Sequence, residues 1–381
     1  MILNVFIYIL LPEGWNFLKH LFIFAAFAAW PLAAQPLAFT TRTVSAGNSP
    51  IAVRVADFNG DNQPDIVVIN AGGSETVSVL LNQGGGEFSA PVTSPTGGVG
   101  GVALTTGDYN HDGKIDLAVV NNLSNNVSIL LGNGDGTFRL ASCVGVHAGP
   151  VAITEADFNG DGNMDLAVIN SLTGDVSILL GKADGTFRPG STVFVGASPT
   201  SIKAADFNGD GIPDLAVANG LYGEQAVYIF LGNGDGTFRA GATVPAGNLP
   251  FGMVAYDFNH DGKTDLAVAN LASNNMSVRL GNGDGTFQPA VNYPAGNGPV
   301  SIRAGVFNQD GNLDLAVCAD VSAEVLVYLG RSDGTFRGPE SFPTGGACNS
   351  VAVGDLNQDG RTDIVAAIAG GVVVFINSGS N

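Results

Sequence analysis

The stretch that decides the fold reads DFNGDGNMD and spans residues 157–165. This nine-residue loop recurs with small changes, and its seven copies lie at 57–65, 108–116, 157–165, 206–214, 257–265, 306–314 and 355–363. Successive copies begin 51, 49, 49, 51, 49 and 49 residues apart. A period this regular indicates a row of similar structural units.

Each loop lies among short apolar segments that alternate with polar residues or are rich in β-branched residues. In the third unit these segments span 151–156, 166–169, 176–180 and 191–195. The last two are separated by a glycine-rich turn of the type GNGDGTF, which occurs at 132–138, 232–238 and 281–287, with variants at 181–187 and 330–336. Such segments and turns predict four short strands in each unit. We find no convincing helix after the first 34 residues.

Seven units of four strands predict an all-β fold, a seven-bladed β-propeller over residues 35–381. The two ends of this region support a closed ring. The chain stops after the third strand of the seventh unit, at 372–376, whereas residues 39–46 form a strand without a unit of its own. We expect this N-terminal strand to complete the last blade, because closure leaves no exposed sheet edge. The rival is an open β-solenoid, which the matching spare and missing strands disfavour.

Residues 1–34 differ from the rest of the chain and resemble a secretory leader. Lys19 and His20 precede the apolar run 21–30, and small residues follow up to Ala34. A basic flank, a short apolar core and small residues are typical of a signal peptide, so we expect cleavage after Ala34 and export. A membrane anchor is the alternative, but polar residues between 12 and 19 interrupt the apolar stretch that a spanning helix needs.

The acidity of the chain is concentrated in the loops. The 381 residues carry a net charge of −19, although only 13 % of them are charged. The seven loops hold 20 of the 34 carboxylates, and the basic residues are scattered singly. This distribution argues against nucleic acid or an anionic membrane as a partner. We expect a monomer with no membrane span in the mature chain.

The loop pattern D-x-N-x-D-G-x-x-D predicts a calcium site. Side-chain oxygens fall at positions 1, 3, 5 and 9, glycine at position 6 permits a sharp turn, and position 7 can offer its backbone carbonyl. Hard oxygen donors at alternate positions are what Ca²⁺ requires. The predicted ligands, with position 7 contributing only its carbonyl, are Asp57, Asn59, Asp61, Gln63, Asp65, Asp108, Asn110, Asp112, Lys114, Asp116, Asp157, Asn159, Asp161, Asn163, Asp165, Asp206, Asn208, Asp210, Ile212, Asp214, Asp257, Asn259, Asp261, Lys263, Asp265, Asn308, Asp310, Asn312, Asp314, Asp355, Asn357, Asp359, Arg361 and Asp363.

Up to seven calcium ions are therefore expected, with one weaker site. Val306 replaces the first aspartate of the sixth loop, so the site at 306–314 should be weak or empty. Asn62 replaces the glycine of the first loop, which asparagine tolerates because it enters left-handed conformations more readily than most residues. The alternative is a set of plain Asx-rich turns. Three carboxylates within nine residues would repel one another without a cation, which favours the calcium interpretation.

At these residues the sequence is similar to the FG-GAP or VCBS-type repeat family. The similarity rests on D-x-[DN]-x-D-G-x-x-D-[LI]-x-V followed by L-G-N-G-D-G-T-F, and it covers residues 39–381. The resemblance implies a seven-bladed propeller with calcium in its hairpin loops, as in the head of integrin α-subunits. Related propellers occur in secreted bacterial proteins and in fungal lectins that bind sugars between blades. The family's ligand-binding residues do not carry over, because no such motif is visible here.

Few other residues suggest chemistry. His111 and His260 occupy the outward-pointing fourth loop position, and His147 is expected in a strand, where a structural role is favoured over catalysis. Cys318 is expected in the core. Cys143 and Cys348 lie near blade junctions and could pair, and at least one of the three thiols must stay free. The irregular connection 219–225 is either a ligand contact or an inert insertion.

Together these features predict a secreted or cell-surface, calcium-stabilised propeller that is not an enzyme. It would act as a binding or adhesion module for an extracellular glycan or protein. Two alternatives stay open: a lyase or hydrolase acting on polysaccharides, and a purely structural envelope protein. The enzymes would need a cluster of His, Lys, Arg or Tyr above a calcium, and the sequence displays none.

Overall fold

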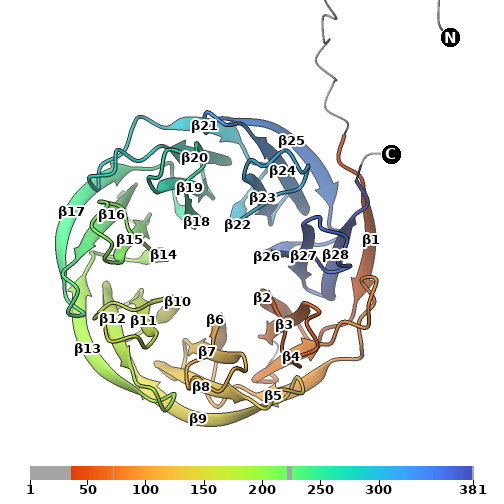
Figure 1. The fold of residues 1–381 in the computed structure, drawn as a ribbon, viewed down its shortest axis with the longest axis horizontal. Helices are drawn as coiled ribbons and strands as arrows, with labels where there is room; N and C mark the ends of the chain where they lie inside the picture. The colour runs from red at the N-terminus through yellow and green to blue at the C-terminus, as the bar shows by residue number, and fades with distance from the viewer. Residues whose placement is uncertain (1–35, 72, 221–224, 380–381) are drawn as a thin grey trace, which may run out of the picture. The chain divides into compact units, whose positions relative to one another are not determined.

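The computed structural model describes residues 36–71, 73–220 and 225–379. The predicted leader, 1–34, and the centre of the connection 219–225 lie outside the described residues. Residues Pro36–Asn381 form one compact unit. It is an all-β ring of seven four-stranded antiparallel sheets, which confirms the predicted seven-bladed propeller (Figure 1). No helix in the described ranges is long and apolar enough to cross a membrane.

The strands follow one another from the centre of the ring outward in every blade (Figure 1). We number the blades in chain order. Blades 1 to 3 contain β2 (Pro50–Ala56), β3 (Asp65–Asn70), β4 (Thr76–Leu80) and β5 (Val92–Pro95); β6 (Gly101–Gly107), β7 (Asp116–Asn121), β8 (Asn126–Gly132) and β9 (Phe138–Gly145); and β10 (Pro150–Ala156), β11 (Asp165–Asn170), β12 (Asp175–Gly181) and β13 (Phe187–Phe194).

Blades 4 to 6 repeat this order, and blade 7 draws on both ends of the unit. Blades 4 to 6 contain β14 (Pro199–Ala205), β15 (Asp214–Asn219), β16 (Ala226–Gly232) and β17 (Phe238–Pro245); β18 (Pro250–Tyr256), β19 (Asp265–Asn270), β20 (Asn275–Arg279) and β21 (Val291–Pro294); and β22 (Pro299–Gly305), β23 (Asp314–Ala319), β24 (Glu324–Gly330) and β25 (Phe336–Pro343). Blade 7 contains β26 (Cys348–Gly354), β27 (Asp363–Ile368), β28 (Gly371–Asn377) and β1 (Phe39–Val44).

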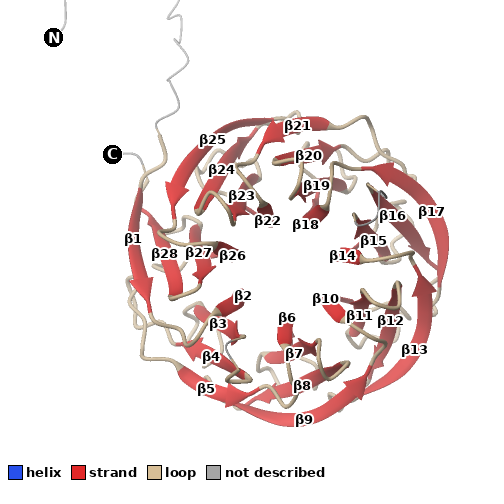
Figure 2. Cartoon of the chain, turned by 180° about the vertical axis from the view of Figure 1, so that it is seen from behind, coloured by secondary structure: helices blue, strands red, loops and turns tan. Residues whose placement is uncertain are grey.

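The ring is closed by pairing of the first and last strands. β1 runs antiparallel to β28 from the pair Phe39–Asn377 to the pair Val44–Val372, as the spare N-terminal strand predicts. The ring of Phe39 then packs edge-on against Phe342, Phe375 and Phe307, with centroid distances of 4.8, 6.3 and 6.4 Å. The outermost strand of blade 7 is therefore anchored both by its ladder and by an aromatic cluster. Figure 2 shows β1 beside β28 from the other side of the ring.

The hydrophobic core lies between neighbouring blades. The second strand of each blade is buried along its whole length, as in β11, because both faces of a blade are covered by its neighbours. One apolar cluster, for example, joins Phe158 and Ile169 of blade 3 to Ile202 and Val217 of blade 4. The GTF phenylalanine of a turn packs edge-on against the loop aromatic of the preceding blade, as in Phe158–Phe238 at 5.4 Å. The recurrent phenylalanine is thus an anchor between blades.

A disulfide joins blades 6 and 7. Cys318 in β23 is bonded to Cys348 in β26, while Cys143 is exposed and free. The prediction that Cys318 is buried is correct, but the sequence placed Cys143 and Cys348 as the possible pair. Cys318 and Cys348 can pair because β23 and β26 belong to adjacent blades and face each other across the junction between them.

Candidate metal centre

Each loop turns twice through the left-handed region of backbone conformation. Position 6 has a positive φ in every loop, including 63° at Asn62, the one residue there that is not glycine. Position 4 also has a positive φ, as in Gly160 at 71° and His111 at 57°. Only glycine adopts this region freely. The sequence did not predict this second turn. Its only signal was the mixture of Gly, His and Gln at position 4, and His and Gln do not mark a left-handed residue.

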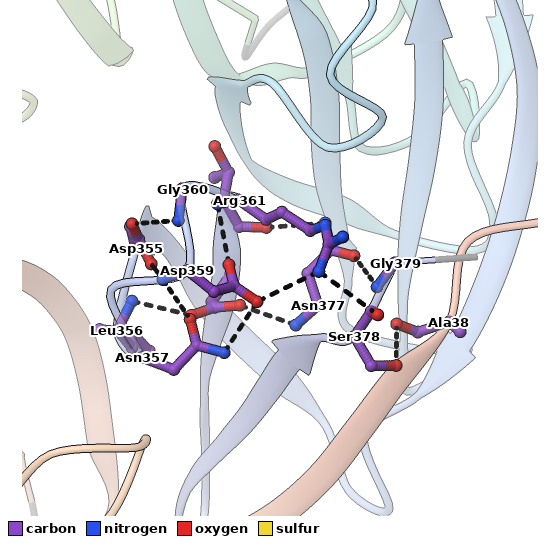
Figure 3. Close-up of polar contacts among 12 residues, drawn as sticks. Ala38, Asp355, Leu356, Asn357, Asp359, Gly360, Arg361, Asn377, Ser378 and Gly379 are labelled. Atoms are coloured by element: carbon purple, nitrogen blue, oxygen red, sulfur yellow. Dashed lines mark hydrogen bonds and ion pairs between the residues drawn. The ribbon is translucent and has the colours of Figure 1, made fainter. Parts of the chain in front are cut away.

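The two turns direct the side-chain oxygens of positions 1, 3 and 5 toward the inside of the loop (Figure 3). In the seventh loop, Asp355 Oδ1 accepts the N–H of Asp359 at 3.0 Å, and Asp355 Oδ2 accepts that of Gly360 at 2.8 Å. Asn357 Oδ1 also accepts the N–H of Asp359, and its amide donates to Asp359 Oδ2 at 3.1 Å. Two carboxylates and one amide oxygen are therefore gathered within one loop.

The aspartate at position 9 is placed differently. Asp363 is fully buried, and its two oxygens accept backbone N–H groups from Leu356 at 2.8 Å and Asn377 at 2.7 Å. Burial raises the pKa of Asp363 to about 6, even though both hydrogen bonds lower it. The other six loops bind their position-9 aspartate in the same way, as Asp165 does with Phe158 and Gly181. Position 9 therefore connects the loop to the end of the third strand.

A glycine at the end of the third strand makes this connection possible. A Cβ atom at Gly181 would lie 2.2 Å from the carbonyl oxygen of Met164 in the loop, so no larger residue fits without movement of the backbone. Gly132, Gly232, Gly281 and Gly330 have the same close approach. The glycine-rich turn is thus a structural partner of the loop.

Blades 1 and 7 carry asparagine where the other blades have this glycine. The amide of Asn82 donates to the carbonyl of Leu356 in blade 7 at 2.7 Å, and that of Asn377 donates to the carbonyl of Phe307 in blade 6 at 2.7 Å. In blades 2, 4 and 5 the turn reaches the preceding loop by a backbone N–H, as Gly236 does with the carbonyl of Phe158 at 2.9 Å. Both junctions of blade 7 are therefore held by side-chain amides.

The sixth loop lacks part of this arrangement. In other loops the first aspartate accepts several backbone N–H groups, as Asp157 does from Gly160, Asp161 and Gly162. Val306 offers no such acceptor, and its own N–H donates to Thr362 Oγ1 at 3.2 Å. One oxygen donor set is thus incomplete, in the loop where the sequence predicts the weakest site.

The remaining donors fit a hard cation such as Ca²⁺. Among the described residues, no three His, Cys, Asp or Glu side chains are grouped as metal ligands. The loop donors are of mixed type: two aspartates, one asparagine oxygen and the carbonyl of position 7, and oxygen donors of this kind suit Ca²⁺. Of the residues proposed from the sequence, positions 1, 3 and 5 are brought together, whereas position 9 is buried with both oxygens hydrogen-bonded.

Two histidines, His111 and His147, contact a neighbouring loop or strand. His111 is exposed at the fourth loop position, and its Nε2 lies 3.1 Å from Asn163 Oδ1 in the next loop. His147 lies in the bend between β9 and β10 rather than in a strand, which corrects the sequence-based expectation. Its Nδ1 lies 2.9 Å from Asp175 Oδ2.

A pocket opens between the first two loops. It has a volume of about 340 Å³ and is lined by both backbone and side chains, among them Asp57, Asn59 and Lys114. This volume lies at the lower end of the range for small-molecule sites. The pocket therefore places polar groups of two adjacent loops around a space that a sugar-sized ligand could occupy.

Comparison with known proteins identifies the repeat and the fold. The family model described as FG-GAP-like repeat matches six overlapping segments, at 57–119, 108–168, 157–217, 206–268, 257–317 and 307–366. No curated protein matches the chain. Among solved structures, BBS1N in complex with ARL6DN has a TM-score of 0.62 at 14 % identity, covering 91 % of this chain and 99 % of that one.

Two further structures share the fold at low identity. A lectin from Agrocybe aegerita that recognises non-reducing terminal N-acetylglucosamine has a TM-score of 0.55 at 20 % identity, covering 85 % of this chain and 87 % of its own. A catalytically inactive virginiamycin B lyase from Staphylococcus aureus, solved with quinupristin, has a TM-score of 0.59 at 15 % identity, covering 89 % and 99 %. Because these neighbours include binding proteins and an enzyme, the likeness establishes the fold alone.

Proposed function

The chain belongs to the FG-GAP-like repeat family, and on that premise we propose that it is a calcium-binding, non-catalytic module that attaches to an extracellular glycan or protein. The observation that carries the proposal is the gathering of Asp and Asn oxygens in the loops. Each loop joins the first and second strands of its blade, so all seven open on the same face of the ring. Calcium would offset the repulsion between the carboxylates and stiffen that face.

The pocket between the first two loops favours a glycan as the partner. The ammonium of Lys114 can donate hydrogen bonds to sugar hydroxyls, and calcium held by Asp57 and Asn59 would fix the wall of the pocket that the first loop provides. The fold of the lectin and that of the BBS1N complex are compatible with a glycan or a protein partner. We take the glycan as the first candidate because the pocket matches a small ligand in volume.

Two features support export. The leader-like segment 1–34 is typical of a secretory signal. The disulfide between Cys318 and Cys348 adds to this, because disulfides persist mainly in oxidising compartments. The proposed location is therefore outside the cell or on its surface.

The calcium part of the proposal is tested by thermal denaturation of the purified protein with calcium and with EGTA. We expect chelation to lower the melting temperature markedly, because ligand that binds only the folded state stabilises it. Titration calorimetry with calcium then gives the number of sites. An unchanged melting temperature in EGTA would rule out the calcium role.

The partner is tested on a glycan array, again with calcium and with EGTA. We expect calcium-dependent binding that is lost in Lys114→Met, which removes a polar group from the pocket. Lys263→Met is the matched control, because Lys263 occupies the same loop position in blade 5 and does not line the pocket. Silence on the array despite calcium-dependent melting would exclude the glycan and point to a protein partner. Cleavage of a polysaccharide would replace the binding proposal by an enzymatic one.

A further inference from the structure

Three basic side chains occupy the same position in the innermost strands of three different blades. Arg54 in β2, Lys203 in β14 and Arg303 in β22 each precede the first position of their loop by three residues. The corresponding residues of the other blades are uncharged: Thr105, Thr154, Val254 and Ala352. The innermost strands surround the centre of the ring (Figure 1). Residues that are far apart in sequence are therefore brought toward one axis.

All three side chains line a single cavity in the centre of the ring. The cavity has a volume of about 140 Å³, and the hydroxyl-bearing residues Ser201 and Ser301 also line it. Arg54, Lys203 and Arg303 are only partly exposed to solvent. Liquid water occupies about 30 Å³ per molecule, so the space holds a few waters or one small ion. It is smaller than the sites that take drug-sized ligands, which begin at about 300 Å³.

Among the described residues, a single carboxylate, that of Glu155, offsets part of the positive charge that lines this cavity. No ion pair joins any of the three cations to a described acidic residue. Glu155 in β10 is the one carboxylate that attracts Lys203 and Arg54 appreciably, and its Oε2 already accepts the hydroxyl of Tyr109 at 2.7 Å. In a protein with a net charge of −19, a local excess of positive charge is unexpected.

The hydrogen-bonding capacity of the three cations is largely unused. The Arg54 guanidinium donates through Nη1 to the carbonyl of Val53, and the Arg303 guanidinium donates through Nη1 to the carbonyl of Ile302, both at 2.8 Å. Lys203 has no hydrogen bond with any residue in the described ranges. Two guanidinium groups and one ammonium therefore keep donors free to bind a ligand, and arginine forks match the oxygens of sulfate and phosphate.

Burial and mutual repulsion disfavour the charged forms of the groups that share this cavity. Burial, with repulsion from Arg303 and Arg54, lowers the pKa of Lys203 to about 7 despite the attraction of Glu155. Burial and repulsion from Arg303 likewise lower the pKa of Arg54 to about 9. A bound anion would oppose both shifts, because an opposite charge favours the protonated form of a lysine.

We propose that the central cavity binds one small oxyanion, such as sulfate or phosphate, held by Arg54, Lys203 and Arg303. The site is independent of the calcium loops and of the pocket between blades 1 and 2, because it shares no lining residue with that pocket. The bound ion would connect blades 1, 4 and 6 across the centre of the ring. The volume of the cavity, about 140 Å³, restricts the ligand to a small ion or to the end of a narrow group.

The test is titration calorimetry of sodium sulfate into the purified protein, with calcium present and sodium chloride at equal ionic strength as the reference. We expect one sulfate per molecule and binding at least about tenfold weaker in Lys203→Met, because this variant removes one charged hydrogen-bond donor from the cavity. Lys182→Met is the matched control, since Lys182 lies in an exposed turn. Arg303→Gln gives a second, independent variant, and thermal denaturation checks that each variant folds.

Two further measurements complete the test: the affinity for sulfate at two pH values, and the affinity for a sulfate ester compared with free sulfate. Sulfate should bind more tightly at pH 6 than at pH 8, because Lys203 loses its proton as the pH rises through about 7. Tighter binding of a sulfated monosaccharide would support the site and identify an ester as the source. Binding no different from chloride, or unchanged in both variants, overturns the proposal. No glycan array or chelator enters this assay, so its failure leaves the proposed function intact.

Discussion

Replacing Phe39 with alanine should show how strongly the first strand closes the ring. Phe39 begins β1, and its side chain packs edge-on against three rings that belong to blades 6 and 7. The variant keeps the backbone ladder between β1 and β28 intact. It removes only the aromatic contacts, so the effect measures side-chain anchoring of the closing strand.

The magnitude follows from the burial and the contacts of the ring. Truncation of a buried phenylalanine to alanine typically costs about 3–5 kcal/mol. Phe39 is partly exposed, so we take the lower end, about 3 kcal/mol. Edge-on aromatic pairs contribute about 0.5–1.5 kcal/mol each beyond burial, so three of them account for a sum of this size. A loss of about 3 kcal/mol increases the unfolding equilibrium constant on the order of 100-fold.

The assay is urea denaturation followed by circular dichroism, with Thr41→Ala as the control. Thr41 is exposed on the same strand, so its truncation should change stability by about 0.5 kcal/mol or less. If Phe39→Ala and Thr41→Ala denature at the same urea concentration, the aromatic cluster does not anchor β1. The closing strand would then depend on its backbone ladder alone.

Three further predictions test the loops and the junctions. Val306→Asp should add one calcium ion per molecule in titration calorimetry, because it restores the missing first donor of the sixth loop; an unchanged number of ions contradicts this. Gly181→Ala should cost about 3 kcal/mol in urea denaturation, since its Cβ would meet a loop carbonyl at 2.2 Å, whereas Gly145→Ala, with no atom within 4 Å, should be neutral. Reduction of the bond between Cys318 and Cys348 should lower stability by about 3–4 kcal/mol, given their sequence separation of 30. Equal denaturation curves with and without reductant, after mass spectrometry has verified reduction, would refute the last prediction.

The fold could be predicted almost completely because each repeat carries its own turn chemistry. Aspartate, asparagine and glycine at fixed intervals mark the hairpins, and the apolar runs between them set the strands. Even the closure by residues 39–46 follows from counting strands, and β1 occupies Phe39–Val44. The disulfide was not predictable, because its two cysteines belong to different repeats and meet only across a junction between blades.

The site was only partly predictable, because the role of an aspartate depends on which backbone groups reach it. The sequence treats Asp157 and Asp165 alike as ligands, yet Asp165 is buried and accepts a backbone N–H from Gly181. That contact comes from 16 residues further along the chain. The central cations were missed for a similar reason. Arg54 and Lys203 look scattered along the chain, and only an alignment of the repeats places them at one position.

The asparagines that flank blade 7 bear on where the ring would break first. A blade assembled from both ends of the chain is the natural point of rupture, because no covalent connection joins its outer strand to the other three. The amides of Asn82 and Asn377 bind that blade to blades 1 and 6, and the disulfide adds a covalent bond to blade 6. Separation of whole blades on heating should therefore start at a junction that has neither such an amide nor the disulfide. Blade 7 can still lose its outer strand, because neither the amides nor the disulfide reaches β1, which is held by its pairing with β28 and by the packing of Phe39.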